Sequence, residues 1–329
     1  MGLREAMTAD SREFYRQFLK ALRYAMPPQN HEPMARLVAQ AIDGICPSLG
    51  VGGERSALQR DGVQRVGAIL RDSVIAEIGP FKIHDGWGRV TGEWGTLFDI
   101  PSSVHVAHYK SDAIAACHDL IYAATDPRVI GPITSYFGCL PTISYFCLWW
   151  SLAGRDKPED AELYHVDKHD YRFAKLFIPL TGVDADSGPT DIIKGSHHIA
   201  YWQAKWGEVA IGNQDQSRFH AMCNAQRKAD ADIAHFFQPD EIETMTAESG
   251  EGYLADTSAW HRGRLPTKRN RLMFQALYTL LPDPKVEPQL LDVPGFERGW
   301  RERFGDALSA EQLRFITRMV LKSQPRGHT

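Results

Sequence analysis

The stretch Tyr164-His165-Val166-Asp167 places an imidazole and a carboxylate two residues apart, in a segment that we interpret as a β-strand. On a strand, side chains at i and i+2 leave the same face, so His165 and Asp167 can reach one ion while Val166 points away. A third ligand is available much later, in the run Asp256-Thr257-Ser258-Ala259-Trp260-His261-Arg262-Gly263. One carboxylate with two histidines leaves coordination positions open and favours non-haem Fe(II) that activates oxygen. We therefore predict that His165, Asp167 and His261 form one metal site.

The order of the motifs around this pair is more specific than any one of them. They are Leu163-Tyr-His-Val-Asp167, Lys175-Leu-Phe-Ile-Pro-Leu-Thr181, Ser187-Gly-Pro189, Lys194-Gly-Ser-His197, and His261-Arg-Gly263 followed by Arg271. These residues resemble the phytanoyl-CoA dioxygenase family. Upstream, Leu58-Gln-Arg-Asp-Gly-Val63 resembles the opening of that family, so the likeness runs from about residue 58 to about residue 281. The resemblance implies a double-stranded β-helix, or jelly roll, that carries Fe(II) and 2-oxoglutarate. It does not imply phytanoyl-CoA as the substrate, because one fold hosts many reactions.

The resemblance also implies where 2-oxoglutarate is held. The family places an Arg on the closing strand, a short way past the second His, to grip the far carboxylate of 2-oxoglutarate, and Arg271 matches by position. A planar guanidinium suits that bidentate contact. Arg269 is the alternate, because loop length can shift the register by two. Where the family usually has a hydroxyl, two residues beyond the second His, this chain has Gly263.

Lys175 and Thr190 complete the candidates for cofactor binding. Lys175 lies in the middle of the strand predicted at 173–180, where an unpaired ammonium is costly to bury. It therefore either reaches solvent at an edge or meets an anionic ligand such as a carboxylate. Thr190 begins the next predicted strand, 190–194, which leads to a pair of histidines.

Other histidines offer rival metal sites. His197 and His198 are the strongest rival, although the resemblance places His197 at the border of the pocket without a bond to iron. His105 and His108 are spaced i, i+3, which on a helix would put both on one face. No carboxylate lies nearby to complete that site, so we interpret this pair as structural.

The composition excludes several classes of protein. The chain has 329 residues, a formal charge of −4 and a pI near 6.4, which gives no basic footprint for nucleic acid. Its five cysteines are an odd number without CxxC spacing, and they indicate reduced thiols in a cytoplasmic protein. The charged beginning of the chain lacks the apolar run of a signal peptide. The longest apolar segment, near 143–152, is too short to cross a bilayer.

We expect one domain with helical additions at both ends. Residues 1–57 form a helical extension, with Phe14, Phe18 and Leu22 at helical spacing, that packs on the barrel or makes a homodimer contact. Residues 58–281 form the jelly-roll core, with strands at 142–151, 173–180, 190–194, 252–257 and 271–278 and two helices within 111–137. A lid-like insertion occupies about 199–251, and 282–329 form a helical tail. The run Gly50–Gly53 is interpreted as a loop.

These expectations lead to one functional prediction and its rivals. The chain is predicted to be an Fe(II)/2-oxoglutarate-dependent dioxygenase that uses O2 to oxidise an unactivated C–H of a small metabolite or natural-product intermediate. Hydroxylation is the default outcome, and succinate and CO2 are the co-products. Desaturation, cyclisation or epimerisation would use the same residues. The rivals are a jelly roll that binds a ligand without turnover and a zinc-dependent isomerase or hydrolase.

Overall fold

Two antiparallel β-sheets form the centre of the protein, whose computed structural model describes residues 26–48, 56–211 and 215–322. The larger sheet has seven strands, in the order β1 (Val63–Ala68), β8 (Glu251–Ala255), β5 (Phe173–Pro179), β10 (Arg271–Thr279), β4 (Thr142–Ser151), β3 (Val106–Tyr109) and β2 (Ile83–Asp85). The smaller sheet has three strands, in the order β7 (Ile242–Met245), β6 (Thr190–Ile193) and β9 (His261–Gly263). The mainly β architecture is confirmed, and its closure into a jelly roll stays a prediction.

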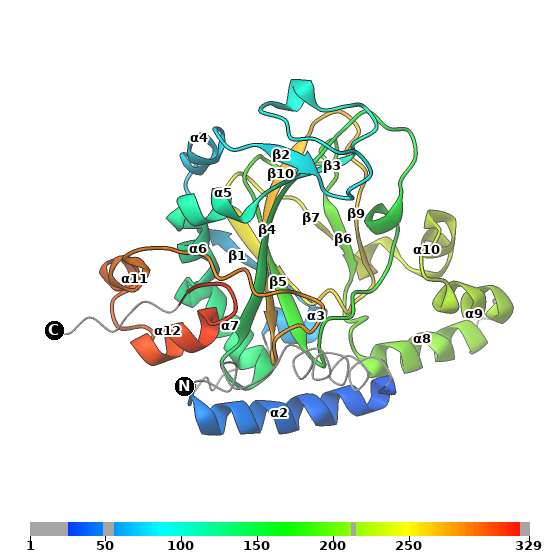
Figure 1. Ribbon diagram of the computed structural model, residues 1–329. Helices are drawn as coiled ribbons and strands as arrows, with labels where there is room; N and C mark the ends of the chain where they lie inside the picture. Colours follow the sequence, from blue (N-terminus) through cyan, green and yellow to red (C-terminus); the bar gives the residue numbers. More distant parts are fainter. Residues whose placement is uncertain (1–25, 49–55, 212–214, 323–329) are drawn as a thin grey trace, which may run out of the picture.

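Helices cover the sheets from two directions (Figure 1). One group lies beside the large sheet and consists of α5 (Ser111–Ala116), α6 (His118–Ala124), α7 (Pro127–Phe137), α11 (Phe296–Phe304) and α12 (Ala310–Thr317). A second group, on the other side of the molecule, consists of α8 (Ile199–Ile211), α9 (Gln216–Asn224) and α10 (Asp230–Phe236). The remaining helices are α2 (His31–Ile45), α3 (Ala57–Asp61) and α4 (Val74–Ile78), with short 3-10 turns η1 (Pro28–Asn30), η2 (Leu97–Asp99), η3 (Asp160–Glu162) and η4 (Pro239–Glu241).

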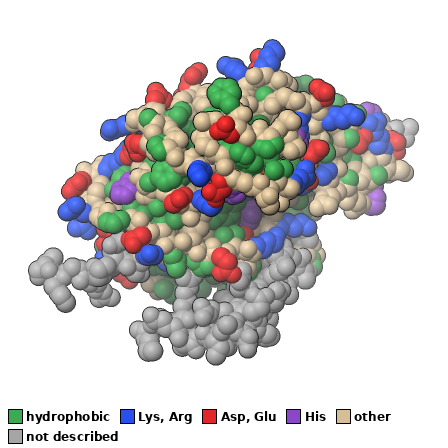
Figure 2. All heavy atoms as spheres, turned by 45° about the horizontal axis from the view of Figure 1, so that its top comes forward, with side chains coloured by type: hydrophobic (Ala, Val, Ile, Leu, Met, Phe, Trp, Pro, Cys, Tyr) green, Lys and Arg blue, Asp and Glu red, His purple; other side chains and the backbone are tan. Residues whose placement is uncertain are grey.

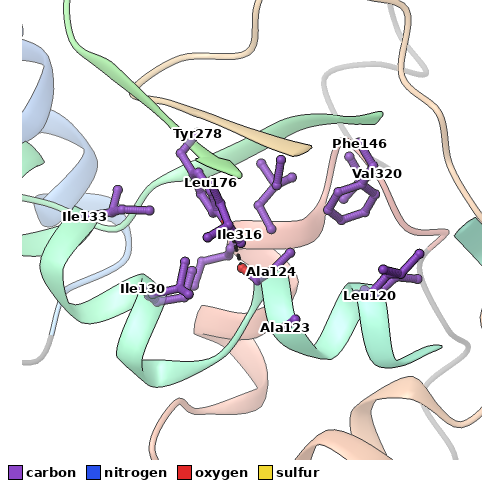
Figure 3. Packing of buried hydrophobic residues seen from close by; sticks show 14 of the residues in the cluster. Leu120, Ala123, Ala124, Ile130, Ile133, Phe146, Leu176, Tyr278, Ile316 and Val320 are labelled. Carbon is purple, nitrogen blue, oxygen red and sulfur yellow. Dashed lines mark hydrogen bonds between the residues drawn. The ribbon is translucent and has the colours of Figure 1, made fainter. Parts of the chain in front are cut away.

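The outer face of the large sheet is apolar and sealed by helices. Side chains alternate between two faces along a strand, and Phe146, Leu176 and Tyr278 all point to this outer face. The hydroxyl of Tyr278 donates a hydrogen bond to the carbonyl of Ala124 at 2.6 Å, which satisfies a buried polar group. Figure 3 shows these side chains packed against residues of α6, α7 and the C-terminal segment, namely Leu120, Ala123, Ile130, Ile133, Ile316 and Val320.

The inner face of the large sheet packs against the small sheet through a second, smaller core. Phe177, Tyr253 and Met273 from the large sheet meet Ile192 and Met245 from the small one. This core is confined to part of the inner face. The rest of that face therefore remains available for polar residues.

The strands expected at 142–151, 173–180, 190–194, 252–257 and 271–278 are present as β4, β5, β6, β8 and β10. Side chains alternate along β4, since Trp149 packs against the inner core and Trp150 against the outer one. The helix expected before Pro27 and the loop Gly50–Gly53 lie outside the described residues.

Two local predictions are wrong, those for 164–167 and for 111–137. The stretch 164–167 is not a strand: Tyr164 and His165 make single bridges, and the pairing ends there because the amide of Asp167 donates to a loop carbonyl, that of Thr257. The helix on which His105 and His108 would share a face is not present: His108 lies on β3, with His105 just before it, because this β-branched and aromatic run pairs with β4. The segment 111–137 forms three helices, with an extra break at Cys117.

The insertion at about 199–251 contains α8, α9, α10 and β7. Its aromatic residues do not project freely: Trp202, Phe236 and Phe237 pack in one cluster with Tyr164 and Trp260. Those last two residues directly precede His165 and His261 in the sequence. The insertion therefore supports the segments that carry the predicted ligands, and its role as a lid stays a prediction.

The surface carries charges of both signs. Figure 2 shows acidic and basic side chains mixed over the face that it presents, without a large area of one sign. Within the described part of the chain, no helix is both long and apolar enough to cross a membrane.

The outer core predicts a stability effect. Leu176 is fully buried, so Leu176→Ala should lower the free energy of unfolding by about 2–5 kcal/mol through lost burial and a cavity. Leu37, which is 61% exposed on α2, provides the matched control, and Leu37→Ala should change it by less than about 0.5 kcal/mol. Urea denaturation measures both free energies of unfolding. Equal changes in the two variants would contradict the burial of Leu176 in the outer core.

Candidate metal centre

The two predicted histidine ligands are brought together by backbone pairing. His165 and His261 form an antiparallel bridge in which each amide donates to the other residue's carbonyl, at 2.9 and 3.0 Å. Side chains of directly paired residues leave the same side of the pair. The two rings accordingly lie with their centroids 4.3 Å apart. Asp167 is tied to the same region, because its amide donates to the carbonyl of Thr257 at 2.8 Å.

The three ligand atoms converge as one metal ion requires. The Nε2 atom of His165 lies 3.7 Å from one carboxylate oxygen of Asp167, and Nε2 of His261 lies 3.4 Å from the other. One ligand atom from each residue can be chosen so that all lie within 4.8 Å of one another. In the described residues, this is the sole group of three or more His, Cys, Asp or Glu with such spacing.

The Nδ1 atoms of both rings make hydrogen bonds that leave Nε2 available for a metal. Nδ1 of His165 donates to the Leu163 carbonyl at 2.9 Å, and Nδ1 of His261 donates to the Ala259 carbonyl at 3.0 Å. A proton fixed on Nδ1 leaves the lone pair of Nε2 free for a metal. The donor set of two imidazoles and one carboxylate therefore fits Fe(II), and positions remain open for further ligands.

The electrostatics also keep two of the ligands, His165 and Asp167, in their metal-binding forms. Burial and the neighbouring His261 ring lower the pKa of His165 to about 3, so its imidazole is neutral at pH 7. Burial alone would raise the pKa of Asp167, but the charge of Lys175 and the His261 ring outweigh it. The pKa of that carboxyl therefore lies well below its ordinary value.

Lys175 meets a carboxylate, and that carboxylate belongs to the metal site itself. Its ammonium lies 2.6 Å from Oδ2 of Asp167, and the side chain is buried in the middle of β5. Burial would lower the pKa of Lys175, but the attraction of Asp167 raises it above its ordinary value. Lys175 therefore does not reach solvent at an edge, and its partner is a protein carboxylate; its role in cofactor binding stays a prediction. The contact occupies one oxygen of Asp167 and leaves the other facing His165.

Arg271 is a buried cation without an acidic partner in the described residues. It is 5% exposed, and its guanidinium donates to the Gly188 carbonyl and to the Ser151 hydroxyl, the latter at 3.3 Å. Its Nε has no hydrogen-bond partner. Burial lowers the pKa of this guanidinium. Because a buried charge costs free energy unless it is paired, this arrangement favours an anionic ligand.

Two hydroxyls lie beside Arg271. The phenol of Tyr253 donates to the hydroxyl of Thr190 at 3.4 Å, and both residues are buried. The charge of Arg271 acts on the Tyr253 phenol. Thr190 is among the residues predicted to bind the cofactor, whereas Tyr253 is not. Tyr253 lies in the middle of β8, and no local sequence signal distinguishes it from a core residue.

Arg269 lies apart from this group. Its guanidinium is 59% exposed and pairs with Asp184 on the loop after β5. Gly263, in contrast, lies against Arg271: a Cβ at that position would be 3.3 Å from Nη2 of the guanidinium. The absence of a side chain at 263 thus leaves room for Arg271 rather than contributing a hydroxyl.

The rival histidines lie elsewhere. Nε2 of His198 contacts the carbonyl of Gln59 at 2.7 Å, and Nε2 of His197 contacts the same carbonyl at 3.3 Å. The ring of His197 packs over Gly62, which has a φ of +78° and closes α3. This pair therefore fixes the start of the core and does not join the triad.

Comparison with known proteins gives structural likenesses only. No family model matches the sequence, and no curated protein matches it, so the resemblance to the phytanoyl-CoA dioxygenase family stays a prediction. Among solved structures, the chain is similar to the non-haem alpha-ketoglutarate-dependent epimerase SnoN from nogalamycin biosynthesis. The identity is 16% and the TM-score 0.39, over 68% of this chain and 77% of SnoN.

Two further likenesses are to proteins from Streptomyces. HygX from Streptomyces hygroscopicus, solved with nickel, 2-oxoglutarate and hygromycin B, shares 14% identity over 81% of this chain and 94% of its own, with a TM-score of 0.41. AviO1 from Streptomyces viridochromogenes shares 13% identity over 70% of this chain and 96% of its own, with a TM-score of 0.37. The chemistry of the present site follows from its own residues.

The triad predicts how metal affinity responds to mutation. Fe(II) binding should be weakened by more than about 100-fold in each of His165→Ala, Asp167→Ala and His261→Ala. Removing a ligand costs more affinity than removing a residue that only hydrogen-bonds to a ligand, which typically costs about 10- to 100-fold. His198→Ala, in the exposed rival histidine, should bind Fe(II) as the wild type does. Anaerobic calorimetric titration measures all four. Equal affinity in the triad variants and the wild type would exclude this metal site.

The neutral state of His165 predicts a pH dependence of stability. An unfolded histidine takes up a proton near pH 6.5, whereas His165 in the folded, metal-free protein does so only near pH 3. Stability that is complete above pH 6.5 is therefore lost as the pH falls toward 3, by about 2 kcal/mol at pH 5. Urea unfolding measures the fall in the free energy of unfolding between pH 7 and pH 5. In His165→Gln this fall should be smaller than in the wild type by about 2 kcal/mol. An unchanged loss would contradict the burial of a neutral ring.

Proposed function

We propose that this protein is an Fe(II)- and 2-oxoglutarate-dependent oxygenase with a jelly-roll core, acting on a small molecule. One observation carries the proposal: the described residues contain both a triad of two histidines and one carboxylate and a buried arginine that has no acidic partner among them. A metal ligand set alone suits several metals. The addition of an unpaired buried cation favours a co-substrate that carries a carboxylate at its far end.

Each residue then has a defined task. His165, Asp167 and His261 hold Fe(II), and Lys175 keeps one oxygen of Asp167 occupied so that the other faces the metal. Arg271 binds the far carboxylate of 2-oxoglutarate. The hydroxyls of Tyr253 and Thr190 provide neutral hydrogen bonds beside it.

When bound, Fe(II), 2-oxoglutarate and O2 together supply the oxidation of an unactivated C–H bond, with succinate and CO2 as co-products. The protein's own contribution is placement and exclusion of water from the inner face. Hydroxylation is the reaction we propose. Desaturation, cyclisation or epimerisation would need the same ligands and a different placement of the substrate.

We also propose that the protein works in the cytoplasm. Its five cysteines are all unpaired. Unpaired thiols are the usual state in a reducing compartment.

The two candidate arginines provide a matched test of the co-substrate site. Arg271→Leu should weaken 2-oxoglutarate binding by about 100-fold, because it removes two charge-assisted hydrogen bonds, while Fe(II) affinity is retained. Arg269→Leu, in the exposed arginine two residues earlier, should bind 2-oxoglutarate as the wild type does. The weak visible charge-transfer band of the anaerobic Fe(II) and 2-oxoglutarate complex reports the titration.

The same experiment can refute the proposal. Wild-type protein that shows neither this band nor affinity for 2-oxoglutarate is not a 2-oxoglutarate-dependent oxygenase. The band should also be absent in His165→Ala and Asp167→Ala.

A further inference from the structure

One part of the inner face of the large sheet is accessible while the other side of the same strands is sealed. Along β4, Tyr145, Cys147 and Trp149 are half-buried. Phe146 and Leu148, which alternate with them, are 2% and 1% exposed. The inner face of β4 is therefore more accessible than its outer face.

The row of half-buried side chains on β4, Tyr145, Cys147 and Trp149, continues across β3 and β2. His108 is directly opposite Trp149 on β4 and His84 on β2, and all three are half-buried. The rings of His84 and His108 have centroids 6.2 Å apart, as do those of His108 and Trp149. Nδ1 of His108 also contacts the thiol of Cys147 at 3.5 Å. The row therefore spans three adjacent strands without interruption.

The row joins the metal centre at its other end. The amide nitrogen of Gln275, on β10, donates to the hydroxyl of Tyr145 at 2.8 Å. The charges of Lys175 and Asp167 both act on the Tyr145 phenol, and the charge of Lys175 acts on the Cys147 thiol. Tyr145 on β4 and Lys175 on β5 are both paired with Leu277 of β10, so Tyr145 lies on the same face as the lysine that contacts Asp167.

Three titratable side chains of the row, Tyr145, Cys147 and His108, are uncharged. Burial raises the pKa of Tyr145 and of Cys147 to about 12, and burial lowers the pKa of His108 to about 4. These three side chains are therefore neutral at pH 7. The nearest charge on this side, Lys175, is already balanced by Asp167. A charged substrate group would find no counter-charge along this row.

Several hydrogen-bonding positions in the row are unused by the described protein. The Tyr145 hydroxyl accepts from Gln275, and its own proton has no acceptor. The carbonyl oxygen of the Gln275 side chain accepts no hydrogen bond, and Nδ1 of His84 is buried without a partner. A donor and an acceptor stand side by side at Tyr145 and Gln275. An alkyl chain laid on this row would leave all three positions unsatisfied, which costs free energy for each buried polar group.

We propose that this row, the neutral wall formed by Tyr145, Gln275, Cys147, His108, His84 and Trp149, binds the substrate of the oxygenase. The inference rests on the proposed function. The substrate class that fits is an uncharged, hydroxyl-bearing compound with a ring that can lie on the Trp149 indole. Its hydroxyls accept from the Tyr145 phenol and donate to the Gln275 amide oxygen. Fatty acyl chains and carboxylate substrates do not fit this wall.

The test uses ligand-observed saturation-transfer NMR on full-length protein loaded with Ni(II), an inert substitute for Fe(II), and 2-oxoglutarate. The probes are uncharged cyclic polyols, myo-inositol and methyl glucoside, with decanoate as the acyl alternative. We expect binding of at least one polyol and none of decanoate. Tyr145→Phe and Gln275→Leu should each weaken polyol binding by about tenfold, the cost of one lost hydrogen bond.

Tyr109→Phe is the matched control. Tyr109 follows His108 on β3 but points to the opposite side, where its hydroxyl accepts from Trp150 at 3.3 Å. Loss of this hydroxyl should leave polyol binding at the wild-type level. The same 2-oxoglutarate titration on each variant shows whether the co-substrate site is intact.

The two proposals fail in different ways. Absence of 2-oxoglutarate binding in the wild type overturns the proposed oxygenase function. Intact 2-oxoglutarate binding with no polyol signal, with decanoate bound instead, or with polyol binding unchanged in Tyr145→Phe and Gln275→Leu overturns the neutral wall alone.

Discussion

The pair of backbone hydrogen bonds between His165 and His261 is the constraint on which the candidate site depends. It joins two segments that are far apart in the sequence, and it sets both rings on one side of the pair. Asp167 follows because its amide is held by Thr257. The residues just before the two histidines, Tyr164 and Trp260, are buried in the cluster built by the insertion. The helices at 199–236 therefore support the ligand geometry through packing, without contributing a ligand themselves.

The central strand β10 contributes one face to the hydrophobic core and the other to the candidate site. Phe274 and Tyr278 point into the outer core, whereas Arg271 and Gln275 point to the inner face. Because the side-chain period of a strand is two, a slip of one residue would move the cation into the apolar core. The pairing of β10 with β4 along its whole length, and with β5 from Met273 to Thr279, opposes such a slip. The same contacts that stabilise the fold thus fix the position of the guanidinium.

Much of this arrangement was predictable from local sequence patterns, and the failures have physical causes. Alternation located β4, β5 and β10, and the ligand types indicated His165, Asp167 and His261. The sequence did not decide which of Arg269 and Arg271 binds 2-oxoglutarate. The two residues are two positions apart, so on a strand both would point to the same face, and the loop before β10 decides which one is buried. Tyr253 and the Tyr145–Gln275 pair were not singled out, since a neutral side chain on a strand has no local feature that distinguishes a binding site from core. Their significance arises from register across strands.

The two-faced character of β4 has a consequence for the adaptability of the protein. Residues 145, 147 and 149 are partly exposed on the inner face, while their neighbours in the chain carry the packing with the helices. Replacement of an accessible side chain therefore removes few core contacts, and the thermal resistance of the fold should be nearly independent of the compound recognised. Such a division lets selection, or a laboratory library confined to these positions, explore new specificities without first acquiring compensating mutations elsewhere.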